Sequence, residues 1–240
     1  MNRPGAAGGE RGRRIVGPVV ALGVLAVLFA ALGQWQVRRL AWKEALIAHV
    51  EAGLGAAPAP LDAIPGGGLG PWEYRRIALS GRYDPRGAVL VTGTSTLGSG
   101  YWAMAPLAMA DGRTVYVNRG FVPLGSRPDA VRAALPAGTV AVVGLLRLNE
   151  PGGTALRANR PAEARWYSRD VAAIAGHHAI HAERRFFIDA QAETPHRPGG
   201  PVPGLTVIAF PNSHLAYALT WFALAVLSAG GATVLWRRRP

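Results

Sequence analysis

The hydrophobic and polar positions divide the chain into a long apolar run near each end and a middle part of short, mixed segments. The first run, Ile15 to Leu32, contains no charged or strongly polar residue. At about 1.5 Å per residue, a helix of this length spans roughly 27 Å, close to the hydrocarbon thickness of a bilayer. The second run, Leu215 to Trp236, carries aromatic residues near both ends, as interfacial anchors do. We predict two transmembrane helices, over residues 15–36 and 214–236.

The first run also resembles the hydrophobic part of a signal peptide, because an arginine-rich head precedes it. It is longer than usual for such a peptide, however, and no A-x-A-like cleavage site follows it. It leads instead into a segment with Trp35 as an aromatic anchor and with Arg38 and Arg39, whose side chains can reach the membrane interface. An uncleaved membrane anchor is therefore the better interpretation.

The middle part begins with a continued helical pattern over Val37–His49, which a loop rich in Pro and Gly ends at residues 56–70. Short strand-like segments separated by turns follow. They are 74–80, 88–92, 100–106, 114–121 (after the hairpin signal Asp111-Gly112), 140–148 and 185–188. One short helix is expected over Val171–Gly176, with Ser168 as its N-cap. The pattern predicts one α+β domain over 37–213 with a mainly antiparallel sheet or small barrel.

The charge distribution predicts the topology. Lys and Arg outnumber Asp and Glu by 26 to 14, a formal net charge of +12. The head, residues 1–14, holds four arginines and one glutamate, and the tail, 237–240, holds three arginines. Half of the positive excess therefore flanks the apolar runs, where short cytoplasmic ends carry it. We expect a protein of the bacterial inner (plasma) membrane with both termini in the cytoplasm and its domain in the periplasm.

Composition and missing motifs exclude several classes of function. The remaining basic residues form no Lys/Arg stripe interleaved with aromatics, which argues against nucleic acid as a partner. The chain has no cysteine and therefore no disulfide, thiolate metal site or thiol nucleophile. It also lacks the G-x-S-x-G, P-loop, dinucleotide-binding and H-E-x-x-H motifs. A membrane-tethered hydrolase is thus disfavoured, and we expect no enzymatic activity.

Two groups of ionisable residues in the middle part have simple structural interpretations. His177, His178 and His181 could hold a metal, but no carboxylate at helical spacing completes the set. Solvated residues at the end of a short helix are the plainer account of this cluster. Asp170 and Asp189 lie near basic residues in the sequence, and we expect them to be structural partners of those residues.

His214 is different, because it lies at the start of the second membrane helix, where an ionisable residue is a functional candidate. At helical spacing it shares a face with Tyr217 and Trp221. A neutral imidazole can be an axial ligand to haem iron, and the guanidinium groups of Arg38 and Arg39 at a similar depth could pair with haem propionates. In the simpler alternative His214 contacts lipid headgroups and the arginines merely reach the interface. The spacing alone leaves both interpretations open.

Five short sequence segments, or strings, along the chain form one ordered pattern. They are Gly33-Gln34-Trp35-Gln36-Val37-Arg38-Arg39 with Trp42-Lys43, Tyr116-Val117-Asn118-Arg119-Gly120-Phe121-Val122-Pro123, Trp166-Tyr167-Ser168-Arg169-Asp170-Val171, Phe186-Phe187-Ile188-Asp189-Ala190, and Pro211-Asn212-Ser213-His214-Leu215 with Trp221-Phe222. In this order, between two membrane helices, they resemble the surfeit locus protein 1 family of cytochrome c oxidase assembly factors. The resemblance covers residues 31–227.

The resemblance implies an inner-membrane protein that helps to mature the haem-copper oxidase. It implies that haem a is bound, with His214 matching the family's histidine, and is passed toward the catalytic subunit of cytochrome c oxidase. Membrane lipid surrounds such a protein, and haem a synthase is a further candidate partner. Ser213 stands where the bacterial pattern of the family has a second Asn, and Ser also caps helices. The alternative function is that of a haem-free membrane chaperone that stabilises an oxidase assembly intermediate.

The resemblance leaves two roles for Asn118, Arg119 and Phe121, which are either domain scaffold or a contact surface for the oxidase. The residues themselves favour a structural interpretation for Phe121, as part of the core. Arg119 is expected either to pair with a carboxylate or to lie on the contact surface, and the sequence does not choose between these.

Overall fold

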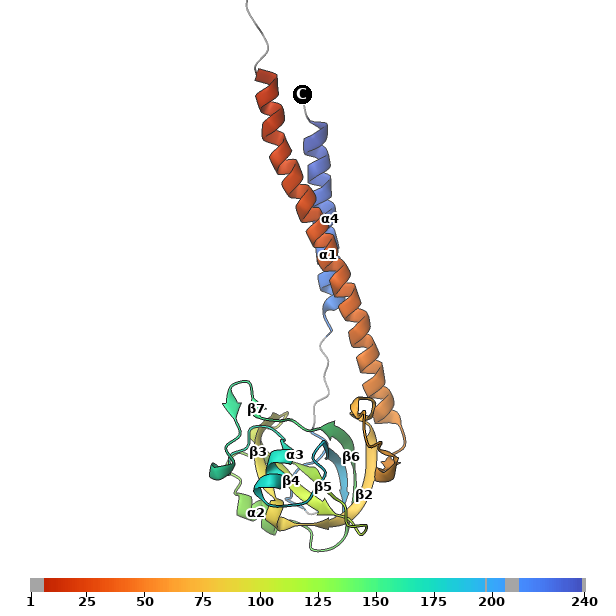
Figure 1. Ribbon diagram of the computed structural model, residues 1–240, viewed down its shortest axis with the longest axis vertical. Coiled ribbons are helices and arrows are strands. Elements are labelled where there is room, and N and C mark those ends of the chain that lie inside the picture. The colour runs from red at the N-terminus through yellow and green to blue at the C-terminus, as the bar shows by residue number, and fades with distance from the viewer. Residues whose placement is uncertain (1–6, 197, 206–211, 239–240) are drawn as a thin grey trace, which may run out of the picture. The chain divides into compact units, whose positions relative to one another are not determined.

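Two long helices near the ends of the chain form one unit, and the residues between them form a β domain (Figure 1). The computed structural model of the protein describes residues 7–196, 198–205 and 212–238, with side chains from residue 15 onward. The predicted cytoplasmic head, 1–14, therefore lies outside the described residues apart from its helical backbone from Ala7, as does the end of the tail, 239–240.

The two helices match the apolar runs. Helix α1 spans Ala7–Gly55 and helix α4 spans His214–Arg237. Both are long and apolar enough to cross a membrane, and the apolar part of α1 has none of its residues buried inside the protein. Helix α1 continues without a break well beyond residue 36, which confirms the helical pattern over Val37–His49.

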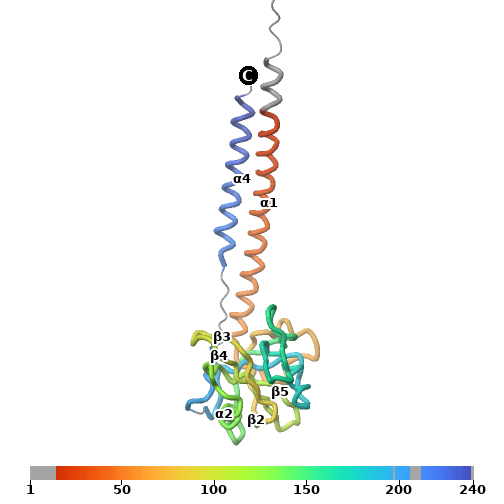
Figure 2. Tube along the Cα trace, turned by 90° about the vertical axis from the view of Figure 1, so that its left-hand side faces the viewer, coloured from red at the N-terminus to blue at the C-terminus, as the bar shows by residue number. Residues whose placement is uncertain are grey.

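The helices pack through a seam with the spacing of a coiled coil. Non-exposed positions recur at alternating intervals of three and four residues, at 15, 19, 22, 26, 29, 33 and 36 of α1 and at 214, 218, 221, 225, 228, 232 and 235 of α4. This heptad spacing keeps one face of each helix toward its partner. Figure 2, turned by 90° from Figure 1, again shows α4 alongside α1.

Two aromatic contacts fix the register of this seam. The ring of Phe29 stacks on that of Trp221, with 5.6 Å between centroids. One turn further along α1, a Cβ atom at Gly33 would lie 2.7 Å from the ring of Phe222. The missing side chain of Gly33 lets the ring of Phe222 pack close to α1, and together with the Phe29–Trp221 stack this contact favours one alignment of the antiparallel helices.

The β domain is a seven-stranded sheet that closes on itself. Its order is β1-β2-β6-β9-β5-β4-β3, and a further pairing of β2 with β4 joins five of the strands into a small barrel. The strands are β1 Ala59–Pro60, β2 Arg76–Tyr83, β3 Val89–Ser95, β4 Gly98–Ala108, β5 Thr114–Pro123, β6 Val140–Leu148 and β9 Phe186–Thr194, and a separate hairpin pairs β7 Gly153–Thr154 with β8 Arg157–Ala158. The pairs β1–β2 and β5–β9 are parallel and the other barrel pairs are antiparallel. The sequence predicted a mainly antiparallel sheet or small barrel between two long helices, and this prediction is confirmed.

A second layer covers one outer face of the barrel. Strand β2 alternates buried and exposed positions, as a strand with one face in water does, whereas β5 is buried along almost its whole length. The outer face of β5 and β9 is covered by helix α3, Val171–His177, and by the segment before it. There Trp166 and Ile174 pack with Tyr116 and Phe187 in a second hydrophobic cluster. This layer explains why Asn118 of β5 and Asp189 of β9 are buried.

Several details differ from the sequence-based expectations. The N-cap of α3 is Asp170, whose side chain accepts a hydrogen bond from the amide of Ala173, so the prediction of Ser168 as the cap was wrong. Strand β9 runs on to Thr194 rather than ending at Ile188. The patterns also missed four short elements, which are helix α2 Pro128–Ala133 and strands β1, β7 and β8.

Candidate functional site

His214, the first residue of α4, faces the helix–helix seam and bonds across it. Its Nδ1 lies 2.7 Å from Oε1 of Gln36 on α1. Gln36 is only 9% exposed and is one of the few polar residues buried in the helix pair. Ser213 occupies the N-cap position of α4, but its side chain makes no capping hydrogen bond within the described part of the chain. The histidine is thus held from the opposite helix rather than by its own helix end.

The partner atom on Gln36 determines which ring nitrogen of His214 carries the proton. In the structure Oε1 of Gln36 faces Nδ1, and because an amide oxygen only accepts hydrogen bonds, this arrangement corresponds to the tautomer with the proton on Nδ1. The neutral imidazole then has its lone pair on Nε2, which makes no hydrogen bond to any described residue. A lone pair of this kind is what an axial ligand offers to a metal.

The two aromatic residues expected beside His214 have different positions. Trp221 lies two turns along the same face, in the seam, stacked on Phe29. Tyr217 is 56% exposed and lies on the flank of α4, outside the seam. The structure therefore brings Trp221 onto the face of His214 and leaves Tyr217 at its edge.

The two arginines of α1 lie at different angles around the helix from the seam that contains His214. Both Arg38 and Arg39 are exposed. Because successive residues turn by about 100°, Arg38 points about 200° away from Gln36, whereas Arg39 lies about 60° from it. The guanidinium group of Arg39 rests 4.1 Å from the ring centroid of Trp42. Arg39 thus flanks the seam that contains His214, and Arg38 lies on the opposite side of α1.

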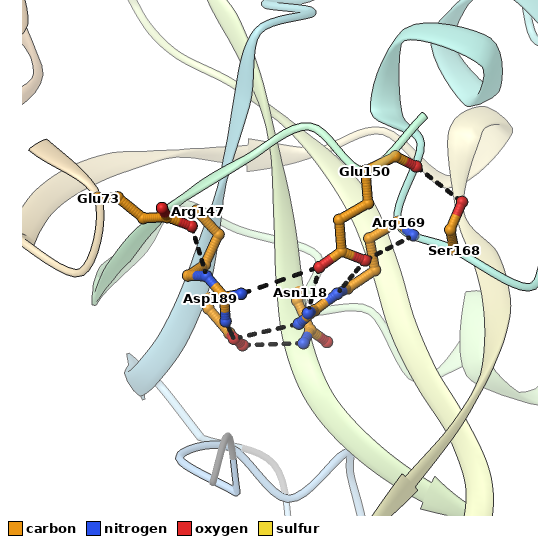
Figure 3. Close-up of polar contacts among 7 residues, drawn as sticks. All are labelled: Glu73, Asn118, Arg147, Glu150, Ser168, Arg169 and Asp189. Carbon is orange, nitrogen blue, oxygen red and sulfur yellow. Dashed lines mark hydrogen bonds and ion pairs between the residues drawn. The ribbon is translucent and has the colours of Figure 1, made fainter. Parts of the chain in front are cut away.

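A second constellation is a buried polar cluster on the covered face of the barrel, shown in Figure 3. Its centre is Asp189 of β9, 4% exposed, whose carboxylate accepts a hydrogen bond from Nδ2 of Asn118 at 2.8 Å. Arg169 approaches the same carboxylate at 3.4 Å and Arg147 at 4.0 Å. Arg169 also pairs with Glu150 at 2.6 Å. The expectation that Asp189 is a structural partner of basic residues is confirmed.

This cluster fastens the covering segment to the sheet. Burial alone would raise the pKa of Glu150, but the hydrogen bonds and charge of Arg169 outweigh it and hold that pKa below its usual range. The hydroxyl of Ser168 donates to the carbonyl oxygen of Glu150, and Asp170 accepts from the amide of Gly152 while it caps α3. These contacts give the cluster a structural role, because they join the segment before α3 to strand β9.

A third group lies inside the barrel. Arg119, 3% exposed, forms two hydrogen bonds with the carboxylate of Glu193, at 2.7 and 2.9 Å. The hydroxyl of Tyr83 donates to the same carboxylate at 2.6 Å. Phe121, two residues after Arg119, is 2% exposed and packs edge-on against Trp102. Arg119 therefore pairs with a carboxylate and Phe121 belongs to the core, and neither forms a contact surface.

Two buried tyrosines make the domain sensitive to high pH. Burial, followed by the charge of Glu193, raises the pKa of Tyr83 well above its usual value, and burial, followed by the charge of Asp84, raises that of Tyr116. Above about pH 10 the unfolded chain loses these phenol protons while the folded chain keeps them, so stability falls as the pH rises. We expect the free energy of unfolding to decrease between pH 9 and 11, by up to about 1.4 kcal/mol per pH unit for each tyrosine.

The matched variant for this prediction is Tyr116→Phe. The hydroxyl of Tyr116 is buried without a hydrogen-bond partner among the described residues, so its removal costs little at neutral pH. Denaturant unfolding at a series of pH values should give the variant a shallower alkaline loss than the wild type. Equal slopes for the two proteins would contradict the prediction.

The remaining candidates carry no site. No three His, Asp or Glu side chains among the described residues are placed to hold a metal ion, and His177 instead packs edge-on against Trp166 and His178. A cleft of about 810 Å³ in the β domain is lined in part by Arg113 and Arg185. Each of these two arginines is already paired with a carboxylate.

Known proteins match most of this chain. The model of the SURF1 family matches residues 23–226. Surfeit locus protein 1 of Homo sapiens is 33% identical over 92% of this chain and 74% of its own length, and that of Rattus norvegicus is 34% identical over 87% and 71%. A SURF1-like protein of Monosiga brevicollis is 35% identical over 88% of this chain and 81% of its own.

Proposed function

The chain belongs to the SURF1 family of cytochrome c oxidase assembly factors, and on that premise we propose that it binds haem a and aids its delivery to the catalytic subunit of the oxidase. The observation that supports this proposal is the orientation of His214. Its Nδ1 is bonded to Gln36, and its Nε2 makes no hydrogen bond to any residue that the structure describes.

The residues present suit a haem. His214 would bind the iron through Nε2, and the iron would supply an open coordination position to that nitrogen. Trp221 lies on the same face of α4 as His214 and is stacked on Phe29, so it adds aromatic surface to the seam beside the proposed site. Arg39 flanks the seam and can pair with a propionate, since it has no carboxylate partner within the described part of the chain. Tyr217 and Arg38 would contribute only from the periphery.

A site of this kind holds its ligand and performs no chemistry on it. One axial imidazole binds less tightly than two would, which suits a cofactor that must be passed on. The position at the end of a membrane helix gives an apolar cofactor a route along the bilayer without crossing water. The proposed role is thus that of a carrier, with the oxidase catalytic subunit as the receiver and haem a synthase as a candidate source.

The proposed setting is the bacterial inner membrane. The two apolar helices would span it, over 15–36 and 214–236, with the arginine-rich head and tail in the cytoplasm. The β domain would then lie in the periplasm.

The test is a visible spectrum. We expect the full-length protein, made in cells that produce haem a and purified in mild detergent, to show a Soret band whose pigment extracts as haem a. His214→Ala should lose most of that absorbance, because the only proposed iron ligand is gone. His49→Ala is the matched control. His49 is an exposed histidine on α1, the helix that also carries Gln36, so its replacement should leave the band intact.

Other outcomes would change the proposal. A colourless wild-type protein would contradict haem binding and favour a haem-free chaperone that stabilises an assembly intermediate. A band that depends on His49 and not on His214 would retain the carrier function and move the site elsewhere.

A further inference from the structure

We infer that Gln36 is a positioning residue for His214, which it holds in the Nδ1–H tautomer so that Nε2 faces the ligand. This inference rests on the proposed haem-binding function and adds a residue on the opposite helix to the site. Gln36 itself would not touch the iron and would act only through the imidazole.

The side-chain amide of Gln36 is buried, and this burial costs free energy unless the amide has a hydrogen-bond partner. Gln36 is 9% exposed in a seam whose neighbouring contacts, Phe29 with Trp221 and Gly33 with Phe222, are apolar. A buried amide without a partner costs free energy, whereas leucine at this position would pack without such a cost. Its hydrogen-bond partner is the imidazole of His214, at 2.7 Å. The glutamine therefore makes physical sense in this seam as the partner of the histidine.

The hydrogen bond between Gln36 and His214 has a direction. A neutral histidine has two tautomers, and only the one with its proton on Nδ1 can ligate through Nε2. Oε1 of Gln36 selects that tautomer, because an amide oxygen accepts a hydrogen bond and cannot donate one. In metal sites, the group bonded to the other ring nitrogen fixes the tautomer and the ring orientation in the same way.

The hydrogen bond between Gln36 and His214 joins helix α1 to helix α4. His214 and Gln36 are 178 residues apart in sequence, and their contact depends on the register of α1 against α4. The Phe29–Trp221 stack and the close fit of Phe222 on Gly33 lie within two turns of it and hold that register. The seam thus delivers the acceptor to the histidine with little freedom.

The experiment compares Gln36→Leu with Gln34→Leu. Gln34 is an exposed glutamine two residues away on the same helix, which makes it a matched control. Leucine is favoured in membrane helices, so neither substitution threatens α1. The first readout is the ¹⁵N spectrum of the full-length protein, labelled at histidine, free of haem and in detergent, with the His214 signals assigned by their loss in His214→Ala. The second is the dissociation constant for added haem a.

We expect wild type and Gln34→Leu to show His214 protonated at Nδ1, and Gln36→Leu to lose this preference. Haem affinity should fall about 10- to 100-fold in Gln36→Leu alone, the usual effect of losing the partner of a metal-bound histidine. A wild-type His214 protonated at Nε2, or a tautomer unaffected by Gln36→Leu, would overturn the inference whether or not haem binds. A wild type that shows the Nδ1–H tautomer but binds no haem would overturn the proposed function and leave the Gln36–His214 contact established.

Discussion

Arg119→Met is expected to lower the free energy of unfolding by about 3–5 kcal/mol, because it leaves the carboxylate of Glu193 buried without its cation. Both side chains are almost fully enclosed, at 3% and 4% exposure, so water cannot replace the lost partner. The guanidinium group also lies 5.0 Å from the ring of Tyr83, a contact that methionine does not reproduce. On this scale the melting temperature should fall by on the order of 10 °C.

The measurement is thermal or denaturant unfolding of the full-length protein in detergent, beside Arg82→Met. Arg82 is an exposed arginine on β2, next to Tyr83, and its substitution should change stability by no more than about 0.5 kcal/mol. Adding Glu193→Gln to Arg119→Met should recover part of the loss, since the unpaired charge is then removed. Equal effects of Arg119→Met and Arg82→Met would show that the buried pair contributes nothing particular.

The five strings that carry the family resemblance converge on a few places in the structure. Asn118, Arg169 and Asp189 come from three different strings and meet in one buried cluster. Gln36 and His214 come from the first and last strings and meet in the helix seam. The middle strings are therefore explained by the fold of the β domain, and the outer pair remains as the candidate for function.

Local signals in the sequence predicted local structure well. The apolar runs gave both long helices, and Asp111-Gly112 marked the β4–β5 hairpin, where Gly112 has a φ of +85°. The closure of the barrel was not specifically visible, because it depends on a pairing of β2 with β4 through only Arg82 and Tyr83. No periodicity along one strand encodes which distant strand it meets.

The same difference between local signals and contacts of distant segments applies to the candidate site. His214 was selected as a candidate from its type and from its place at the start of the second apolar run. The sequence analysis did not identify Gln36 as its partner, although Gln36 continues the heptad spacing of Phe29 and Gly33 along α1. Arg38 was expected near the histidine from its depth along the helix alone, whereas the angle around the helix places it on the other side. Ser168 and Asp170 are both good caps, and the contacts of Ser168 with Glu150 decided between them.

Gly120→Ala should be as damaging as the loss of Arg119, for a reason of space rather than charge. Gly120 has a φ of +128°, a conformation that residues with a Cβ rarely adopt. A Cβ placed there would lie 2.2 Å from the carbonyl oxygen of Val202, on the segment that pairs with β5 through an antiparallel bridge at Phe121. That segment is held by two backbone hydrogen bonds between Phe121 and Val202, both 2.9 Å long, and a methyl group at Gly120 would force it away.

We expect Gly120→Ala to cost about 3 kcal/mol or more, from backbone strain of about 1–2 kcal/mol and the loss of these contacts. Gly125→Ala separates the two causes, because Gly125 also has a positive φ, of +91°, but nothing lies within 4 Å of the added methyl group. It should show the strain alone, about 1–2 kcal/mol. Limited proteolysis near residues 198–205 would show whether the segment that contains Val202 is released in Gly120→Ala. If both variants lose the same stability and neither is cleaved faster, the close approach of Val202 does not explain the glycine, and the backbone conformation alone does.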